Sequence, residues 1–368
     1  MYRLIVILFS LLISVACTPA KQSENGANPA PFETERFSFL HEDIKLVGLI
    51  DTPTKGDPRG LVIMVPGSGG TNIISDQWNR ELRELLVSHG FRVFAYDKPG
   101  NGDSEGVFNS DQPVEDSADE IVAAIEALRT EGLIADDVIG LWGISRAGWI
   151  APLVIAKDPS VDFWISVSGP IHLDNFAYLL ETNWRIKGYP EERVQRLRAE
   201  YLKGFDIQRS GGTYRDYLEA TPNFNDDPLS VQLRGEYTED RFLSYQKFLS
   251  GNPPVIDAET GLMIHVEDYP QLLSSIDVPT LAQFGEGDSQ LDWNATRELY
   301  QRTLTGDGQL SVVSFPQCNH GIQPCESCAF DDNMSTVLRE GFGPACEGFF
   351  PSTSAWLEQV GFPKRTDK

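Results

Sequence analysis

The feature that most constrains the fold of this chain is an alternation of short β-rich runs with amphipathic helical segments. Residues 60–65 form an unbroken apolar run, which is typical of a strand buried on both faces of a parallel sheet. Residues 78–89 then place Trp78, Leu82 and Leu86 at helical spacing. The alternation continues with strands at 91–96, 137–142 and 161–168 and helices at 114–129 and 147–156. This pattern predicts an α/β fold with a mostly parallel central sheet and helices on both faces.

The alternation stops over residues 171–270 and resumes after them. Within this insert, Pro190 opens a helix that carries Val194, Leu197 and Tyr201 on one face. The βα pattern returns with strands at 280–285 and 309–315 and helices at 293–303 and 353–360. We therefore expect the insert to form a largely helical cap on a core made of residues 35–170 and 271–368. An antiparallel strand pair is expected to open that core, at 37–40 and 44–51.

The N-terminus has the pattern of an export signal. Arg3 precedes an uncharged apolar run at 4–15, which is too short to span a bilayer and has the length of a signal-peptide core. Small residues then lead to Cys17, an arrangement that resembles the lipobox of bacterial lipoproteins. The resemblance implies a signal peptide at 1–16 and a lipid anchor on Cys17 that attaches the chain to a membrane. Ordinary secretory cleavage nearby is the alternative.

Thr18 follows Cys17 where, in such lipoproteins, an aspartate marks retention at the inner membrane. The resemblance therefore implies export to the bacterial cell envelope, with the protein anchored at the outer membrane and facing the periplasm. Residues 17–34 are expected to form a flexible tether, because 19–31 are rich in Pro, Asn, Ser and Ala.

The cysteines fit an oxidising compartment. Five are present, and without Cys17 an even number remains, all late in the chain: Cys318, Cys325, Cys328 and Cys346. In an exported chain such a cluster favours a pair of disulfides over a zinc site or a redox motif. The Cys-x-x-Cys spacing at 325–328 lacks the strand that feeds directly into a helix in thioredoxin-like motifs.

The charge balance excludes one class of partner. The chain has 30 Lys and Arg residues against 54 Asp and Glu residues, a formal net charge of −24. A surface this negative repels phosphate backbones, and no run of basic residues offsets it. We therefore expect no nucleic-acid partner.

A candidate nucleophile lies between a predicted strand and a predicted helix. Residues 143–148 read GISRAG and follow the strand at 137–142. This context suits a nucleophile elbow, in which small neighbours let a serine adopt a strained turn with its hydroxyl above the sheet. Ser145 is the candidate, with Ala147 in place of the second glycine of the G-x-S-x-G pattern. The alternative is an ordinary turn in which Ser145 caps a helix.

An oxyanion hole is expected from backbone N–H groups near this serine. Residues 65–70 read VPGSGG at the end of an earlier predicted strand, where their amides could point into the site. By position, the N–H of Arg146 is one donor. Ser68 is favoured as the second donor, and Gly67 is its rival.

The acid and base candidates arrive in a consistent order. Asp288 lies just past one predicted strand, and His320 follows the last one. Serine, acid and histidine, each at the end of a strand, follow the chain order of the α/β-hydrolase triad. His320 is then the general base and Asp288 the acid that orients it, with Asp292 and Asp174 as the alternative acids.

On these residues the chain resembles the α/β-hydrolase superfamily. Residues 96–104 also resemble the arginine-glycine turn of that family, with Pro99 at the arginine position. The resemblance covers most of 37–361 apart from the insert and the cysteine segment, and it is closest to serine aminopeptidase-like and esterase-like members with a helical cap. It implies an α/β-hydrolase fold.

Other interpretations of the glycine-rich turns fail. The third glycine of a dinucleotide fingerprint that starts at Gly67 would fall at Asn72, and no acidic residue stands in the expected place. A phosphate-binding P-loop would end in Gly-Lys-Ser/Thr, which this turn lacks. No histidine and carboxylate spacing indicates a catalytic metal. The sequence therefore predicts neither a cofactor nor a metal.

The candidate residues predict hydrolysis of a small-molecule carboxylic ester through an acyl-enzyme. An exopeptidase that acts on a free N-terminus is the alternative within the same fold. The insert at 171–270 has nearly the same net charge per residue as the rest of the chain, so its acidity does not separate the two. A non-catalytic, lipid-anchored binding protein on a hydrolase scaffold is the alternative from another class. Its mark would be the loss of a triad residue, and none is lost.

Overall fold

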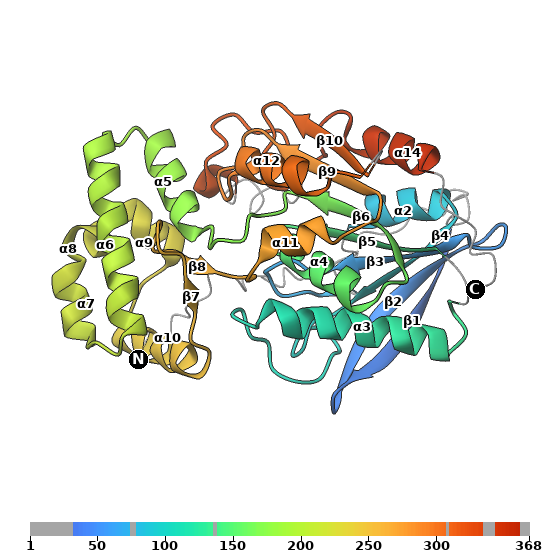
Figure 1. Ribbon diagram of the computed structural model, residues 1–368, viewed down its shortest axis with the longest axis horizontal. Coiled ribbons are helices and arrows are strands. Elements are labelled where there is room, and N and C mark those ends of the chain that lie inside the picture. Colours follow the sequence, from blue (N-terminus) through green and yellow to red (C-terminus); the bar gives the residue numbers. More distant parts are fainter. Residues whose placement is uncertain (1–31, 74–78, 135–137, 307–308, 334–342, 361–368) are drawn as a thin grey trace, which may run out of the picture.

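The computed structural model describes residues 32–73, 79–134, 138–306, 309–333 and 343–360 (Figure 1). The predicted signal at 1–16, the predicted anchor residue Cys17 and most of the predicted tether lie outside these residues. Among the helices of the described part, none combines the length and the apolar character needed to cross a membrane.

The core is built on an eight-stranded sheet with the order β1-β2-β4-β3-β5-β6-β9-β10. Its strands are β1 (Phe32–His41), β2 (Ile44–Pro53), β3 (Gly60–Val65), β4 (Phe91–Tyr96), β5 (Val138–Ile144), β6 (Val161–Val167), β9 (Thr280–Gly285) and β10 (Leu310–Phe315). β2 pairs antiparallel with β1 and with β4, and the remaining neighbours pair parallel. β3 and β9 are buried along their whole length, as their apolar runs predict. The prediction of a mostly parallel sheet is confirmed.

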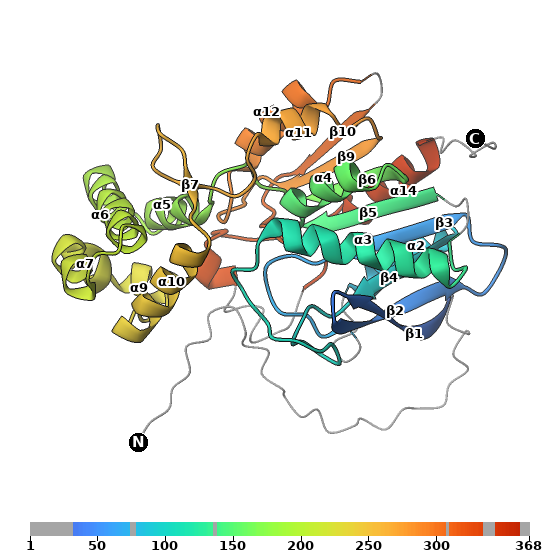
Figure 2. The same ribbon diagram turned by 60° about the horizontal axis from the view of Figure 1, so that its bottom comes forward.

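Helices cover both faces of this sheet (Figure 2). The helices that share one hydrophobic cluster with the sheet are α3 (Val114–Thr130), α4 (Ala147–Lys157), α11 (Tyr269–Ser274) and α12 (Trp293–Thr303). A second cluster, on the opposite face, includes α2 (Arg80–Ser88) and α14 (Phe349–Gln359). Two clusters are needed because successive strand side chains point to opposite faces, and both faces of this sheet are apolar.

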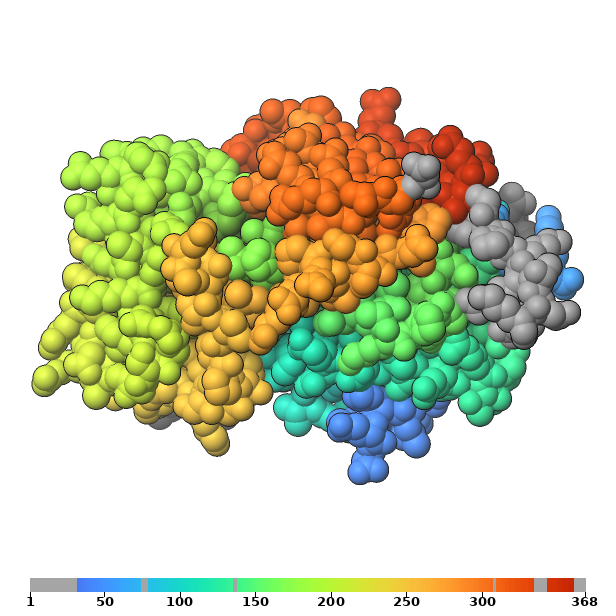
Figure 3. Space-filling model, in the orientation of Figure 1, coloured from blue at the N-terminus to red at the C-terminus, as the bar shows by residue number. Residues whose placement is uncertain are grey.

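Between β6 and β9 the chain leaves the sheet and forms a separate lobe of helices, which we call the cap (Figure 3). Its elements are α5 (Phe176–Ile186), α6 (Glu191–Arg209), α7 (Tyr214–Ala220), α8 (Pro222–Asp226), α9 (Pro228–Arg234), α10 (Glu239–Gly251), β7 (Val255–Ile256) and β8 (Met263–Ile264). The cap has a hydrophobic cluster of its own, centred on Trp184, Leu197 and Phe224. Val266 and Tyr269 belong instead to the cluster of the sheet, so the chain rejoins the core a few residues before position 270.

Two elements begin several residues earlier than the sequence predicts. β1 begins at Phe32 rather than at 37, so it takes in residues that the sequence assigns to the tether. Its first residues alternate poorly and are mostly exposed, and only the ladder with β2, which pairs Phe32 with Pro53, defines them as strand. α14 begins at Phe349 rather than at 353, because Pro351 lies in the first turn, where a helix tolerates proline.

Candidate active site

Ser145 occupies the turn between β5 and α4 in a strained backbone conformation. Its φ is 61°, in the left-handed region that non-glycine residues rarely adopt. The strain is held by hydrogen bonds on both sides: the Ser145 N–H donates to the carbonyl of Val167 at 2.9 Å, and the Gly148 N–H donates to the carbonyl of Ser145 at 2.7 Å. This geometry is the one that a nucleophile elbow requires.

The small residues around Ser145 are required by close packing. A Cβ at Gly143 would lie 2.4 Å from the Cβ of Ala147, and a Cβ at Gly148 would lie 2.8 Å from the Cα of Gly169. Ala147 is itself fully buried. Its methyl group fits only because residue 143 has no side chain, which explains how alanine can replace the second glycine of the pattern.

Asp288 and His320 form a hydrogen-bonded pair beyond the ends of β9 and β10. His320 Nδ1 lies 2.7 Å from Asp288 Oδ2, and the Asp288 side chain is fully buried. The other carboxylate oxygen accepts from the N–H groups of Gln290 at 2.8 Å and Leu291 at 3.2 Å. Since Oδ1 accepts these backbone N–H groups, Oδ2 is left to accept a hydrogen bond from Nδ1–H of His320, and Nε2 is then the free acceptor of the ring.

The sheet brings this pair and Ser145 to the same edge. β5, β6, β9 and β10 are consecutive parallel neighbours, so their carboxyl ends lie together. Ser168, which follows β6, connects the turns, since its Oγ donates to the carbonyl of His320 at 2.8 Å. In the described part of the chain no hydrogen bond joins Ser145 Oγ to His320. Such bonds are often long in active sites without substrate and shorten when one binds.

The two alternative acids have other partners. Asp292 caps α12, and its Oδ1 accepts from the N–H of Ala295 at 3.0 Å. Asp174 lies where the chain enters the cap, and its Oδ2 is 3.3 Å from Nε2 of His265. Of the three candidate acids, Asp288 alone is hydrogen-bonded to His320 among the described residues.

The candidate oxyanion loop lies next to the nucleophile turn. A Cβ at Gly67 would lie 3.2 Å from the carbonyl oxygen of Ile144, so the loop passes directly beside the residue before Ser145. The guanidinium of Arg146 is bound elsewhere, because it donates to Ser117 Oγ at 3.1 Å and to the carbonyl of Gln112 at 2.6 Å. Arg146 is therefore left with its backbone N–H as the group available to the site.

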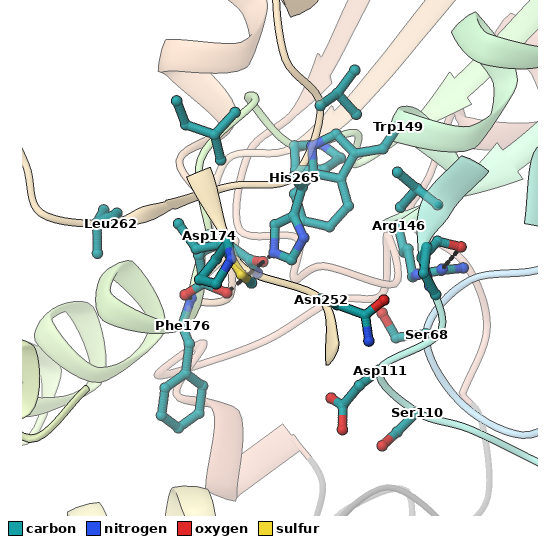
Figure 4. Close-up of a pocket in the computed structure, with 18 of the residues that line it drawn as sticks. Ser68, Ser110, Asp111, Arg146, Trp149, Asp174, Phe176, Asn252, Leu262 and His265 are labelled. Carbon is teal, nitrogen blue, oxygen red and sulfur yellow. Dashed lines mark hydrogen bonds and ion pairs between the residues drawn. The ribbon is translucent and has the colours of Figure 1, made fainter. Parts of the chain in front are cut away.

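A cavity of about 1510 Å³ lies between the cap and the part of the core that carries Ser145 and the candidate oxyanion loop (Figure 4). Ser68, Ser145 and Arg146 line it from the core. Among the side chains that the cap contributes are several aromatic ones: Phe176, Tyr201, Phe205, Tyr217, Phe224, Tyr237, Tyr245 and Phe248. The predicted serine and both predicted oxyanion residues thus line one cavity. The cavity is large enough for a bulky organic substrate, which aromatic side chains of the cap would contact.

The comparison with known proteins agrees with this architecture. Residues 62–334 match the alpha/beta hydrolase family. The chain belongs to that family. Two crystal structures of the esterase Pf2001 from Pyrococcus furiosus align with TM-scores of 0.51 and 0.52, at 14% and 15% identity. The alignments cover 91% and 89% of this chain and 94% and 91% of the esterase.

An acylaminoacyl peptidase from Pyrococcus horikoshii aligns with a TM-score of 0.49 at 13% identity, over 92% of this chain and 43% of the peptidase. No curated protein matches the sequence. At such identities the likeness to the Pf2001 esterase shows a shared fold, and the substrate has to be argued from the residues of this hydrolase.

The sequence did not reveal the contact that joins core and cap in this hydrolase. Leu173 and Ile264 form an isolated antiparallel bridge between the segments that lead into and out of the cap. Beside it, the ring of His265 packs against that of Trp149 in α4, with centroids 4.1 Å apart and the ring planes tilted by 32°, next to Asp174 (Figure 4). The residues are far apart in sequence and follow no spacing pattern, so no local signal could have found them.

Carboxylates and tyrosines share the cavity wall. Burial raises the pKa of the Asp111 carboxyl, although Arg241 and Arg146 oppose the shift. Burial, and then the negative charges of Asp174 and Asp111, raises the pKa of Tyr245. Tyr245 therefore stays a neutral hydrogen-bond donor at physiological pH, in surroundings poor in water.

The four late cysteines of this hydrolase are paired as Cys318–Cys346 and Cys325–Cys328. The carbonyl of Cys318 accepts from the N–H of Gly287 at 2.8 Å, which joins the loop of His320 to the loop of Asp288. The first disulfide then ties this loop to the segment before α14. In the described part of the chain, no group of His, Cys, Asp and Glu side chains has an arrangement that could hold a metal ion.

Proposed function

We propose that this protein is a serine hydrolase that cleaves carboxylic esters with Ser145 as nucleophile, His320 as general base and Asp288 as orienting acid. One observation carries the proposal: a strained serine turn and a buried, hydrogen-bonded Asp288–His320 pair lie at the ends of neighbouring parallel strands. An ordinary turn needs neither a serine at a φ of 61° nor a histidine held by a buried carboxylate beside it.

The proposed reaction proceeds by acyl transfer to water. Nε2 of His320 takes the proton of Ser145 Oγ as the oxygen attacks the ester carbonyl carbon. The negative charge moves to the carbonyl oxygen, where the N–H groups of Ser68 and Arg146 stabilise it. The C–O bond to the alcohol then breaks, and the alcohol leaves with the proton from His320. Water repeats the sequence on the acyl-enzyme, which releases the carboxylic acid and restores Ser145.

The first test is labelling with a fluorophosphonate probe, which reacts with activated serines. We expect one adduct, and peptide mass spectrometry should map it to Ser145. An unlabelled protein, or an adduct on another serine that survives in Ser145→Ala, would contradict the proposal. The same experiment decides against a non-catalytic binding protein, because a scaffold without an activated serine would not react.

An exopeptidase is the second candidate, and the cavity supplies an observation that favours it. Asp111 and Asp174 place carboxylates on a wall shared with Ser145, where they could receive the ammonium group of a free N-terminus. A panel of chromogenic esters of increasing chain length, assayed beside aminoacyl anilides, separates the two functions. We expect the esters to be the better substrates by kcat/KM; a preference for anilides with a free amine would select the exopeptidase.

We further propose that the protein is exported, is lipid-anchored through Cys17 and faces the periplasm at the outer membrane. The two disulfides support export, because such bonds persist in oxidising compartments. Metabolic labelling with a fatty-acid analogue, followed by membrane fractionation, tests the anchor. Cys17→Ser should lose both the label and the membrane association, whereas a protein that is merely secreted would show neither in the wild type.

A further inference from the structure

Lys98 lies behind the candidate oxyanion loop. It follows β4 and is only 6% exposed. Its ammonium donates to three successive carbonyls of the loop: to Gly67, to Ser68 at 3.0 Å and to Gly69 at 2.8 Å. One buried side chain thus binds the backbone of the entire loop.

The contact requires the charged form of the lysine. Three carbonyls accept, and an ammonium has three N–H donors, whereas a neutral amine has one fewer. Within the described residues Lys98 has no carboxylate ion-pair partner. Burial, together with the guanidinium of Arg146, lowers the pKa of Lys98 to about 7, and Glu120 opposes the shift. A buried cation without an ion pair is costly, and such groups are concentrated at functional sites.

Because the peptide bond is planar, the hydrogen bonds from Lys98 to the carbonyls also fix where the N–H groups of the same peptides point. In a trans peptide the C=O and the following N–H point to opposite sides. The carbonyl of Gly67 shares its peptide plane with the N–H of Ser68, so a Gly67 carbonyl turned toward Lys98 turns the Ser68 N–H away from it. The N–H of Gly67 belongs to the peptide of Pro66, whose carbonyl is not among the acceptors of the Lys98 ammonium in the described part of the chain. This distinction favours Ser68 over Gly67 as the oxyanion donor.

We propose that Lys98 is a positioning residue, whose ammonium holds the carbonyls of Gly67–Gly69 and so points the Ser68 N–H at the oxyanion. The inference rests on the proposed function, because it assumes acyl transfer at Ser145. The ammonium also places a positive charge behind the peptide dipoles, so that the loop is polarised in the direction that stabilises negative charge at the site.

The base of the loop has other anchors, so a variant at Lys98 should still fold. The N–H of Lys98 donates to Thr71 Oγ1 at 2.8 Å, and Asp97 Oδ1 accepts from the N–H of Ile73 at 2.8 Å. Neither bond uses the ammonium. Without the ammonium, the peptide planes at 67–69 should therefore be able to rotate, while the other hydrogen bonds keep the path of the chain.

The test compares Lys98→Met, Lys98→Arg and the wild-type chain on a p-nitrophenyl ester that the wild type hydrolyses. Lys98→Met should lower kcat by about 100-fold, the effect of losing one oxyanion donor, with little change in KM. Lys98→Arg should recover most of the rate, because a guanidinium also donates several charged N–H groups. Lys157→Met, which removes a surface lysine paired with Asp119, is the matched control and should keep the wild-type rate.

A pH profile adds a readout that loss of packing alone would not move. In the wild type, kcat should fall above pH 7 as Lys98 loses its charge, and in Lys98→Arg that fall should move to higher pH. The titratable or charged groups that act on Lys98 are Arg146 at the start of α4 and Glu120 of α3; the packed ring of Phe108 does not titrate. Burial raises the pKa of the Glu120 carboxyl and lowers the pKa of the Arg146 guanidinium. Both groups are unchanged in Lys98→Arg, so a shift of the alkaline limb in that variant reports on residue 98.

A folded Lys98→Met variant with wild-type kcat would overturn the proposal. If that variant does not fold, an identical alkaline limb in Lys98→Arg and the wild type would overturn it instead. The proposed function fails separately, when the wild type neither reacts with a fluorophosphonate nor hydrolyses esters. A wild type labelled at Ser145, together with Lys98→Met labelled equally fast, would refute the role of Lys98 alone.

Discussion

The loops at the carboxyl edge of the sheet and the helices of the cap are held in place in different ways. The loops interlock through their backbones: a Cβ at Gly285, which precedes the loop of Asp288, would lie 2.2 Å from the carbonyl oxygen of Asn319, next to His320. The cap is stabilised by its own small cluster and touches this edge through side chains, such as Asn183, which donates to the carbonyl of Ser289 at 3.1 Å. Backbone contacts fix the positions of the loops closely, whereas the side chains through which the cap contacts this edge can be replaced by substitution without changing the path of the chain.

This difference teaches which property each region controls. A reacting group must be held to a fraction of an ångström, and interlocked strand ends can do that. A substrate pocket must fit a shape, and aromatic side chains on a separate lobe can change that shape without disturbing the sheet. Substitutions at the edge of the sheet should therefore lower kcat, and substitutions in the cap should change KM and the range of substrates.

The largest effect is expected at Ser145. Ser145→Ala should lower kcat on esters by at least about 1,000-fold, because no other group can form the acyl-enzyme. Steady-state kinetics should show the loss, and Ser250→Ala, at an exposed serine of α10, should show none. Equal turnover in Ser145→Ala and the wild type would mean that Ser145 is not the nucleophile and that the reaction occurs away from the carboxyl edge of the sheet.

A comparison of two neighbouring aspartates gives the next largest effect. Asp288→Asn should lower kcat by about 1,000-fold or more, because an amide no longer holds the His320 ring in the correct tautomer. Asp292→Asn is the matched control and should change kcat little, since asparagine also caps helices well. A reversed ranking would move the role of the acid to the start of α12.

The disulfides test whether the loop of the base needs its covalent tie. Oxidised protein should show no free thiol among the four late cysteines, and mild reduction should lower kcat about tenfold while the far-ultraviolet circular dichroism changes little. Cys318–Cys346 spans 28 residues and Cys325–Cys328 spans 3. In the chain-entropy model these bonds stabilise by about 3.6 and about 1.6 kcal/mol.

The double variant Cys318→Ala/Cys346→Ala should therefore reproduce the effect of reduction on kcat, and Cys325→Ala/Cys328→Ala should have the weaker effect. Full activity of reduced protein with four free thiols would mean that backbone contacts alone hold the base.

The smallest effect is expected in the cap. Phe248→Ala should raise KM for bulky acyl esters by about tenfold and change kcat by less, because it removes an aromatic side chain that the cap contributes to the cavity. Leu243→Ala, on the same helix but 51% exposed, should change neither. If Phe248→Ala lowered kcat equally on short and bulky esters, the cap would control kcat as well, and the division of roles between sheet edge and cap would be wrong.

Local sequence patterns predicted the sheet well. The bounds of β3, β4, β9 and α12 match the prediction to the residue. Each of these elements is strongly apolar or strongly periodic, and its neighbours in sequence carry clear turn signals. The predicted bounds were furthest off at the starts of β1 and α14, where strand pairing and a proline in the first turn decided the boundary and hydrophobicity did not.

The sequence by itself determined that strand ends carry a serine, an acid and a histidine in a set order, because a turn after a parallel strand is a local feature. Only the tertiary structure decided that Asp288 rather than Asp174 contacts His320, and that Cys318 pairs with Cys346. It also decided that Lys98 binds the loop at 67–69 and that aromatic side chains of the cap close the cavity. These contacts join residues far apart in the chain. The packing of the sheet and the cap decides which of these residues meet, and local sequence patterns do not predict that packing.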